Sequence, residues 1–308
     1  MTFNVENLFS RFAFNKRDQE SYLAVADALD APDRNDLVRA YHNILEDENR
    51  VATGLAVGAG NPDILCLQEV ESLRVLDYFH GRFLRRMARE YDYRYLIEGN
   101  DPRGIDVAIL SRYKIESVSS HRQQRIDNQR VWSRDCLEVD VKVHGKLLTV
   151  YVNHFKSMMG GRDATADRRR TQAQALVELI KDRFGGDPSG GAWVIAGDLN
   201  DYHQIDGSAV PSSLDELGIG SFCHDMLERQ EPAERWTHYW AGGDECRQLD
   251  YILVSPAIHD ATPSTALVDV IRQGLPHRAP FSGERFPRIG YDRPKASDHC
   301  PLMAELTF

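Results

Sequence analysis

The pattern of apolar and polar positions changes repeatedly along the chain between short apolar runs and longer amphipathic stretches. Apolar residues at helical spacing predict helices, whereas short apolar runs closed by Gly, Pro, Asn or Asp predict strands. The predicted helices cover residues 22–29, 37–57, 73–89 and 163–184. The predicted strands cover residues 2–5, 63–70, 93–97, 105–110, 115–119, 136–143, 147–152, 192–196, 249–254 and 301–307.

The order of these elements indicates the class of fold. Residues 137–143 and 146–152 flank His144-Gly145, and this pattern predicts a hairpin with a two-residue turn. Strands dominate, with a few long helices between them, which is typical of an α/β protein built on layered sheets. Because no repeat, low-complexity segment or linker divides the chain, we expect one domain over residues 1–308.

Composition excludes some classes of protein. The 308 residues are 42% hydrophobic and 27% charged, as expected for a globular protein with a substantial core. The net charge of −10 argues against nonspecific coating of nucleic acid, because Lys and Arg supply that affinity, but it allows a local basic track on an enzyme. Five cysteines without a CxxC pair predict reduced thiols and a cytoplasmic location.

The start of the chain resembles neither a leader nor a membrane anchor. No charged and then apolar leader is present, and no apolar run approaches the roughly 20 residues that a membrane span needs. The segment MTFNVENLF opens directly in a predicted strand, so we expect a few natural residues upstream of Met1. We also expect a monomer without a transmembrane segment or a stable protein partner.

Polar side chains recur where the apolar strands end or begin. Asn4 and Glu6 are two positions apart, and so are Asp198 and Asn200 in WVIAGDLNDY, so each pair is predicted to share one face of its strand. The other members of this set are Glu69, His154, Asp250, Asp298 and His299. Each residue alone is more typical of a turn that ends a strand. Together they predict a site of oxygen ligands and two histidines, which favours Mg²⁺ or Mn²⁺ over zinc.

With these residues in place, the sequence resembles the endonuclease/exonuclease/phosphatase superfamily, which includes pancreatic deoxyribonuclease, abasic-site endonucleases, neutral sphingomyelinases and inositol-polyphosphate phosphatases. The matching segments follow the family order over nearly the whole chain: TFNVENLF, DILCLQEV, GIDVAILSR, VNHFKS, VIAGDLND, LDYILVS and SDHCPL. The resemblance implies the DNase I-like fold, a four-layer α-β-β-α sandwich of two mixed β-sheets packed face to face with helices outside.

The resemblance also implies a role for each polar residue. Asp198 would orient or deprotonate the attacking water, and Asn200 would hold a phosphate oxygen. The implied metal ligands are Asn4, Glu6, Glu69 and Asp298. Glu6 departs from the abasic-site endonucleases, which have an aspartate in its place.

Two histidines are implied to be catalytic. Asp250 and His299 resemble a pair in which the acid fixes the imidazole tautomer and raises its basicity. His154 resembles the second histidine of the deoxyribonuclease and sphingomyelinase branches, with Glu98 as its expected acidic partner. Which histidine protonates the leaving group stays open.

Several cations are candidates for binding the substrate. Arg112, Arg134 and Lys156 resemble positions that approach phosphate, although solvated surface charges would look the same in the sequence. The Arg-rich segments 162–170 and 272–295 are equally compatible with a rim for a polyanion and with structural or solvated charge.

The leading prediction is a divalent-metal-dependent phosphodiesterase acting on DNA or RNA, because VNHFKS followed by an Arg-rich helix resembles bacterial nucleases. The alternative is a phosphoesterase for lipid headgroups, inositol phosphates or other small phosphoesters, a substrate class for which an acidic protein has no handicap. The third alternative is an inactive binding module on the same fold. Such a module should have lost some of the catalytic residues, and all of them are present.

Overall fold

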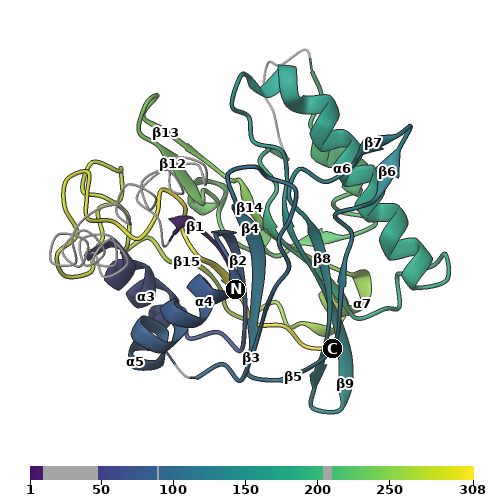
Figure 1. Ribbon diagram of the computed structural model, residues 1–308, viewed down its shortest axis with the longest axis horizontal. Helices are drawn as coiled ribbons and strands as arrows, with labels where there is room; N and C mark the ends of the chain where they lie inside the picture. Colours follow the sequence, from purple (N-terminus) through teal and green to yellow (C-terminus); the bar gives the residue numbers. More distant parts are fainter. Residues whose placement is uncertain (10–47, 89, 204–209) are drawn as a thin grey trace, which may run out of the picture.

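The computed structural model describes residues 1–9, 48–88, 90–203 and 210–308 (Figure 1). The predicted helix at 22–29 and the first part of the predicted 37–57 helix lie outside the described residues. Within these ranges, every helix is too short or too polar to serve as a membrane span.

The first sheet has six strands in the order β15-β16-β1-β2-β4-β3. Their bounds are β1 (Thr2–Leu8), β2 (Ile64–Val70), β3 (Tyr93–Leu96), β4 (Asp106–Ser111), β15 (Val268–Val270) and β16 (Leu302–Ala304). Strands β1 and β2 are parallel, and the other pairs are antiparallel. The ends of β1 and β2 therefore reach the same edge of the sheet, where Asn4, Glu6 and Glu69 lie.

The second sheet also has six strands, in the order β11-β14-β10-β9-β8-β5. Their bounds are β5 (Lys114–Ser120), β8 (Cys136–Val143), β9 (Lys146–His154), β10 (Trp193–Asp198), β11 (His224–Asp225) and β14 (Asp250–Val254). Asp198 is the register partner of His154 on one side and of Asp250 on the other, so three predicted site residues lie in one row. The predicted hairpin between β8 and β9 is confirmed.

Two short ribbons lie outside the main sheets. They are β6 (Arg125–Ile126) with β7 (Gln129–Arg130), and β12 (His238–Trp240) with β13 (Glu245–Arg247). The ribbon of β12 and β13 lies beside the row of site residues, because His238 forms an isolated antiparallel bridge with His299.

Helices cover the outer face of each sheet (Figure 1). The helical elements are α3 (Glu48–Gly60), α4 (Leu73–Phe79), η2 (His80–Leu84), α5 (Arg85–Met87), α6 (Arg162–Arg183), η3 (Ser213–Leu217), η4 (Met226–Arg229), η5 (Pro232–Glu234) and α7 (Pro256–Ala261). The predicted 73–89 helix is thus interrupted by the π-helical turn η2. Helices α3, α4 and α5 lie outside the first sheet, and α6 lies outside the second.

Three apolar cores hold the layers together. One lies between the two sheets and includes Val107 and Val139. The second joins Leu65 of β2 to Phe79 of α4, and the third packs α6 against the second sheet. This arrangement confirms the predicted four-layer α-β-β-α sandwich.

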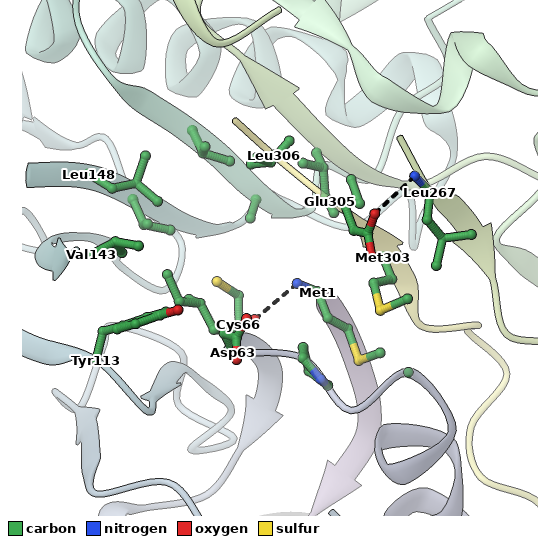
Figure 2. A pocket seen from close by; sticks show the side chains of 18 of the residues that line it. Met1, Asp63, Cys66, Tyr113, Val143, Leu148, Leu267, Met303, Glu305 and Leu306 are labelled. Atoms are coloured by element: carbon green, nitrogen blue, oxygen red, sulfur yellow. Dashed lines mark hydrogen bonds between the residues drawn. The ribbon is translucent and has the colours of Figure 1, made fainter. Parts of the chain in front are cut away.

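A cavity of about 680 Å³ opens between the sheets at the edge where β1 and β2 begin (Figure 2). Leu148 and Val150 of β9 line it from one side, and Met1 and Phe308 lie at its border. The Met1 amino group donates a hydrogen bond to the Ile64 carbonyl at 3.0 Å. Because it lies at the start of β1 and β2, the cavity is separated from the row of predicted site residues by the length of these strands.

Candidate active site

A hydrogen bond between buried side chains joins the strand ends of the two sheets. Asn4 Nδ2, in β1, donates to Asp198 Oδ2, in β10, at 3.1 Å, and both side chains are buried. Asp198 Oδ1 accepts a hydrogen bond from the Asn200 backbone N–H at 2.9 Å. The two pairs that the residue spacing predicted, Asn4 with Glu6 and Asp198 with Asn200, are thus connected across the sandwich through Asn4 and Asp198.

Gly197 allows β10 to approach β9 closely at this point. Its φ is 152°, and a Cβ atom here would lie 1.9 Å from the Asn153 carbonyl oxygen. Gly197 is not part of a turn, because it is paired within β10 on both sides, with Asn153 of β9 and Tyr251 of β14. Its function is to bring Asp198 beside His154.

Four residues at this edge have a positive φ without being glycine. The angles are 47° for Glu6, 61° for Asn7, 67° for Glu69 and 52° for Asn200. Such conformations cost about 1–3 kcal/mol each and concentrate at functional sites. Glu6, Asn7 and Glu69 lie where the β1–β2 and β2–β4 registers shift, and such bulges re-aim side chains. Glu6 therefore does not follow the simple strand alternation that its spacing from Asn4 predicts.

Three carboxylates gather at the ends of β1, β2 and the last loop. Burial raises the pKa of Glu69 and of Glu6, and the charge of Asp298 raises both further. Glu6 is also ion-paired with Lys295 at 2.7 Å and with Arg293 at 2.9 Å. Carboxylate and amide oxygens suit Mg²⁺ or Mn²⁺, and a bound cation would offset the repulsion that raises these pKa values. The donor set therefore fits a divalent metal ion.

Asp198 lies between both histidines. Its Oδ2 is 3.4 Å from His154 Nε2 and 3.8 Å from His299 Nε2. Burial raises the pKa of Asp198 to about 7, although the charge of His299 opposes this. A buried carboxylate with a raised pKa is a typical proton acceptor.

His299 is held by a carboxylate. Its Nδ1 is 2.8 Å from Asp250 Oδ2, which also accepts a hydrogen bond from the Thr237 hydroxyl at 2.8 Å. Burial lowers the pKa of His299, but the charges of Asp250 and Asp198 outweigh it and hold this pKa well above its usual value. The structure therefore brings together the acid–histidine pair that the resemblance implied.

His154 has a different environment. Burial, followed by the charge of Arg134, holds the pKa of His154 well below its usual value. Its Nδ1 is buried and has no hydrogen-bond partner among the described residues. Within the described residues, Asp198 is the carboxylate at ion-pair distance, whereas Glu98, the expected partner, is not. His154 is therefore a neutral imidazole that offers one N–H.

A cationic cluster flanks Glu69 and His154. Arg134 is buried, donates to the Phe155 carbonyl at 2.8 Å and pairs with Asp101 at 3.1 Å. Arg103 pairs with the same Asp101 at 2.8 Å. The charges of Arg103 and Arg134 lower the pKa values of Glu69 and His154, which places both arginines next to these residues.

Lys156 lies near the same two arginines, Arg134 and Arg103. Burial lowers its pKa, and the charges of Arg134 and Arg103 lower it further. The structure therefore brings Lys156 and Arg134 to the site, as predicted, and adds Arg103. Arg103 escaped the sequence analysis because DPRG, ahead of β4, is indistinguishable from an ordinary turn.

Arg112 is not part of this cluster. Its guanidinium binds Asp63 Oδ1 at 2.9 Å and the Asn61 carbonyl at 3.2 Å, and it stacks over Tyr91. These partners lie where β2 begins, beside the cavity of Figure 2 and at the opposite end of the sheet from Glu69. The structure therefore does not bring Arg112 to the site described here, and its predicted contact with substrate stays a prediction.

The Arg-rich start of α6 is used internally. Arg162 and Arg169 pair with the buried carboxylate of Asp201 at 2.7 and 3.3 Å. Asp201 also accepts a hydrogen bond from the Ser213 backbone N–H at 3.0 Å. The positive charge at this helix start is thus paired with the buried carboxylate of Asp201.

The 272–295 loop reaches the site only through its last part. Arg285 donates to backbone carbonyls of the loop itself, and Arg278 pairs with Asp292 at 2.8 Å. Arg293 and Lys295 pair with Glu6. Most of the loop's positive charge is therefore structural.

A third histidine, His238, lies at the site although no sequence signal identified it. Its ring centroid is 4.5 Å from that of His299, and its Nε2 is 3.9 Å from Asp298 Oδ2. Burial, and then the charge of His299, lowers the pKa of His238 to about 3. In the sequence this residue stands among the aromatic residues of WTHYW, which are typical of a core.

Comparison with known proteins gives a consistent result. The sequence matches the Endonuclease/Exonuclease/phosphatase family over residues 1–299. Nocturnin from Drosophila melanogaster is 21% identical over 231 residues, which are 63% of this chain and 33% of that protein. The chain thus spans about a third of the length of this curated relative.

Solved structures show the same fold. An endonuclease/exonuclease/phosphatase from Bacteroides vulgatus superposes with a TM-score of 0.57 at 16% identity, over 99% of this chain and 97% of that one. The human Nocturnin catalytic domain with a bound sulfate anion gives a TM-score of 0.54 at 16% identity, over 85% and 87% of the two chains.

Proposed function

Since the chain belongs to the endonuclease/exonuclease/phosphatase family, whose members are phosphoester hydrolases that generally use a divalent metal, we propose that it is a phosphodiesterase acting as a nuclease. The observation that carries the proposal is the position of Asp198. Its carboxylate lies between Asn4 of the metal-ligand group and both histidines, so a water molecule and a phosphate placed there would face all of them.

Each side chain has a distinct task in the proposed reaction. Asp198 orients the attacking water and accepts its proton. His154, as a neutral N–H donor, and the Asn200 amide hold a phosphate oxygen. His299, fixed by Asp250, donates a proton toward the leaving oxygen.

The metal ligands in this proposal are Glu69, Asn4, Glu6 and Asp298. When bound there, a Mg²⁺ or Mn²⁺ ion supplies positive charge that stabilises the phosphate oxygens during attack. For Glu6 to take part, its carboxylate must exchange Lys295 and Arg293 for the metal.

Two observations bear on the substrate. The resemblance of VNHFKS to nucleases, with Arg103 and Lys156 beside the site, supports a nucleic acid, whose phosphates on either side of the cleaved bond need cations. The internal use of Arg162 and Arg169, together with the net charge of −10, favours the second candidate, a small phosphoester such as a lipid headgroup or an inositol phosphate.

A hydrolysis panel tests both levels of the proposal. The substrates are supercoiled plasmid, single-stranded DNA, RNA, sphingomyelin and inositol phosphates, each with Mg²⁺, with Mn²⁺ and with EDTA. His299→Ala and Asp198→Ala are measured alongside. We expect nucleic acid to be cleaved only with metal, and both variants to lose at least about a hundredfold in kcat.

Each outcome has a defined meaning. Full activity in either variant would contradict the assigned mechanism. An intact plasmid and intact single strands, with turnover of a small phosphoester, would replace the nuclease by the second candidate. Activity that persists in EDTA after dialysis would contradict the role of the metal.

A further inference from the structure

We propose that the ribbon of β6 and β7 is an arm that binds the phosphates of a nucleic-acid strand beside the candidate active site, through Arg125 of β6 and Arg130 of β7. The inference rests on the proposed function for its substrate class, a nucleic acid. It concerns binding of the strand outside the catalytic residues, and not cleavage.

The ribbon projects from the edge of the second sheet at which the catalytic residues lie. Strand β5 ends at Ser120, and β8 begins at Cys136. Cys136 is the register partner of Asn153, which is next to His154 at the end of β9. The chain between β5 and β8 therefore leaves and re-enters the sheet at the active-site edge, and Figure 1 shows the ribbon projecting beside α6.

The ribbon has a fixed turn and a fixed base. Its turn residues, Asp127 and Asn128, have φ angles of 48° and 63°, which is typical of the two-residue turn that matches the twist of a hairpin. At the base, Gln124 Oε1 accepts a hydrogen bond from Trp132 Nε1 at 2.8 Å. Trp132 is buried in the core that packs α6 against the second sheet. The arm is therefore anchored in the core, with its tip in solvent.

The fold does not neutralise the positive charge of the ribbon. Arg125 and Arg130 are exposed, and no carboxylate in the described part of the chain lies within ion-pair distance of either. Both donate to uncharged oxygens, Arg125 to the Asn128 carbonyl at 2.6 Å and Arg130 to Asn100 Oδ1 at 2.9 Å. The arginines at the start of α6, by contrast, are paired with a buried carboxylate. The ribbon charge is thus available to a ligand.

The two arginines face each other across the ribbon. They are register partners, so their side chains project on the same face. Like charges directly opposite each other destabilise a pair of strands. A phosphate bound between the two guanidinium groups would offset this repulsion and accept charge-assisted hydrogen bonds from them. An anionic ligand therefore accounts for a pairing that the stability of the ribbon does not.

The basic face of the ribbon is turned toward the cationic cluster of the site. Asn100, which holds Arg130, donates its backbone N–H to the Arg134 carbonyl at 3.2 Å. Arg134 and Arg103 share Asp101, the next residue in the chain. A single phosphate engages the catalytic residues alone, whereas the phosphates of a nucleic-acid strand repeat and can continue past this cluster onto the ribbon.

Binding of single-stranded DNA without metal tests the arm separately from cleavage. Fluorescence anisotropy of a labelled strand of about 20 nucleotides, in EDTA and at several salt concentrations, gives the Kd and its salt dependence. Arg125→Gln/Arg130→Gln should bind at least about tenfold more weakly than the wild type. The slope of log K against log salt should fall by about 1.4, because each phosphate contact on a single strand contributes about 0.7.

A matched control removes the same charge elsewhere. Arg85→Gln/Arg86→Gln replaces two exposed arginines of α5, outside the first sheet, and should bind the strand as the wild type does. Equal Kd values and salt slopes in the wild type and the ribbon variant would overturn the proposal. An equal loss in the α5 variant would also overturn it, because net charge alone would then explain the binding.

A milder substitution guards against misfolding. Circular dichroism compares the secondary structure of each variant with that of the wild type. Arg125→Gln alone removes a side chain whose partner lies in the turn of the ribbon itself, and it should lower the salt slope by about 0.7. Arg125→Lys/Arg130→Lys keeps both charges and should keep most of the slope. A lysine variant that loses as much of the slope as the glutamine variant would contradict binding through charge.

Failure of this proposal and failure of the proposed function are distinguishable. Strand binding that depends on the ribbon arginines, without cleavage of any nucleic acid, would support the arm and contradict the nuclease. Metal-dependent cleavage of nucleic acid with the same KM in the wild type and the ribbon variant would support the proposed function and contradict the arm. A wild type that binds no strand would overturn the arm, whichever small phosphoester it hydrolyses.

Discussion

Asp198 and Asp201 are three positions apart in WVIAGDLNDY, and both are buried, but their surroundings are opposite. Asp198 faces Asn4 and two histidines at the strand ends. Asp201 is enclosed by Arg162, Arg169 and Ser213. The first arrangement suits a proton acceptor, and the second fastens α6 to the loop that follows β10.

We therefore expect opposite effects from two conservative substitutions. Asp198→Asn should lower kcat by about 10²–10⁴, because it removes a proton acceptor, and should change the melting temperature little. Asp201→Asn should lower the free energy of unfolding by about 3–5 kcal/mol, because it leaves two arginines without their buried partner. Steady-state kinetics and urea unfolding of both variants measure the difference.

Each variant is the control for the other. A strongly destabilised Asp198→Asn protein with normal kcat would show that this carboxylate is structural. A stable Asp201→Asn protein would show that the two arginines find solvent or other partners.

Residue spacing predicted the candidate site only where local geometry decides the outcome. Asp198 is the last residue of β10 and Asn200 follows two positions later, so the apolar run was sufficient to locate both at the strand end. The pairing of Asp201 with Arg162 and Arg169 depends on how α6 packs on the sheet. The position of His238 depends on its β-bridge to His299, which lies 61 positions later in the chain. Neither contact leaves a signal in the neighbouring sequence.

The buried carboxyl group of Asp225 should make the stability of the fold depend on pH. Burial raises its pKa to about 7, while its Oδ1 and Oδ2 accept hydrogen bonds from the Leu227 N–H and from Gln248. The folded protein keeps this carboxyl protonated at pH values where the unfolded chain, in which an aspartate has its ordinary pKa of 3.8, has released the proton. The stability that the neutral carboxyl contributes is therefore complete below about pH 4 and is lost as the pH rises through about 7.

Asp225→Asn removes this titration. The free energy of unfolding of the variant, relative to wild type, should increase by about 2–3 kcal/mol between about pH 5 and about pH 8. Urea unfolding at several pH values in this range measures it. A difference that does not change with pH would mean that Asp225 is ionised in the folded protein, whatever the absolute stabilities are.

At the scale of elements, strands β9 and β10 can approach each other closely because Gly197 of β10 has no side chain. Gly197→Ala would place a Cβ atom 1.9 Å from the Asn153 carbonyl oxygen, at a φ of 152° that alanine rarely adopts. We expect a loss of about 3 kcal/mol or more in the free energy of unfolding, because these parallel strands must separate. Chemical unfolding measures the loss.

Gly190→Ala is the matched control. A Cβ atom at Gly190 meets no atom within 4 Å, so this variant should stay within about 0.5 kcal/mol of wild type. Equal stability of the two variants would contradict the role assigned to Gly197.

The elements themselves were largely predictable, and their irregularities were not. Apolar runs located the central strands because a buried strand must be apolar whatever its neighbours are. The bulges at Glu6 and Glu69 and the π-helical turn η2 alter registers that the periodic pattern treats as regular. These bulges set the direction of two candidate metal ligands, Glu6 and Glu69. The predicted side-chain directions are therefore least accurate at the edge of the sheet where the candidate active site lies.

At the scale of the whole molecule, the candidate site is the place where the two sheets are joined by polar groups. Glu69 and Asn4 come from one sheet and Asp198 from the other, and Asn4 already bonds Asp198. Without a cation, burial and the charge of Asp298 raise the pKa of Glu69, so its ionised form is unfavourable in the folded state. A metal ion bound here should therefore stabilise the whole sandwich.

This argument predicts that metal binding and stability change together. Mg²⁺ at about 100 times its Kd should add about 2.7 kcal/mol to the unfolding free energy of the wild type, and scanning calorimetry should show a higher Tm. Glu69→Gln should abolish most of that increase, and its metal-free form should be at least as stable as metal-free wild type, because a buried charge is gone. Glu305→Gln, at the border of the cavity, should keep the full increase. An undiminished Mg²⁺ effect in Glu69→Gln would show that the cation binds elsewhere, since a ligand can stabilise the fold only through the residues that hold it.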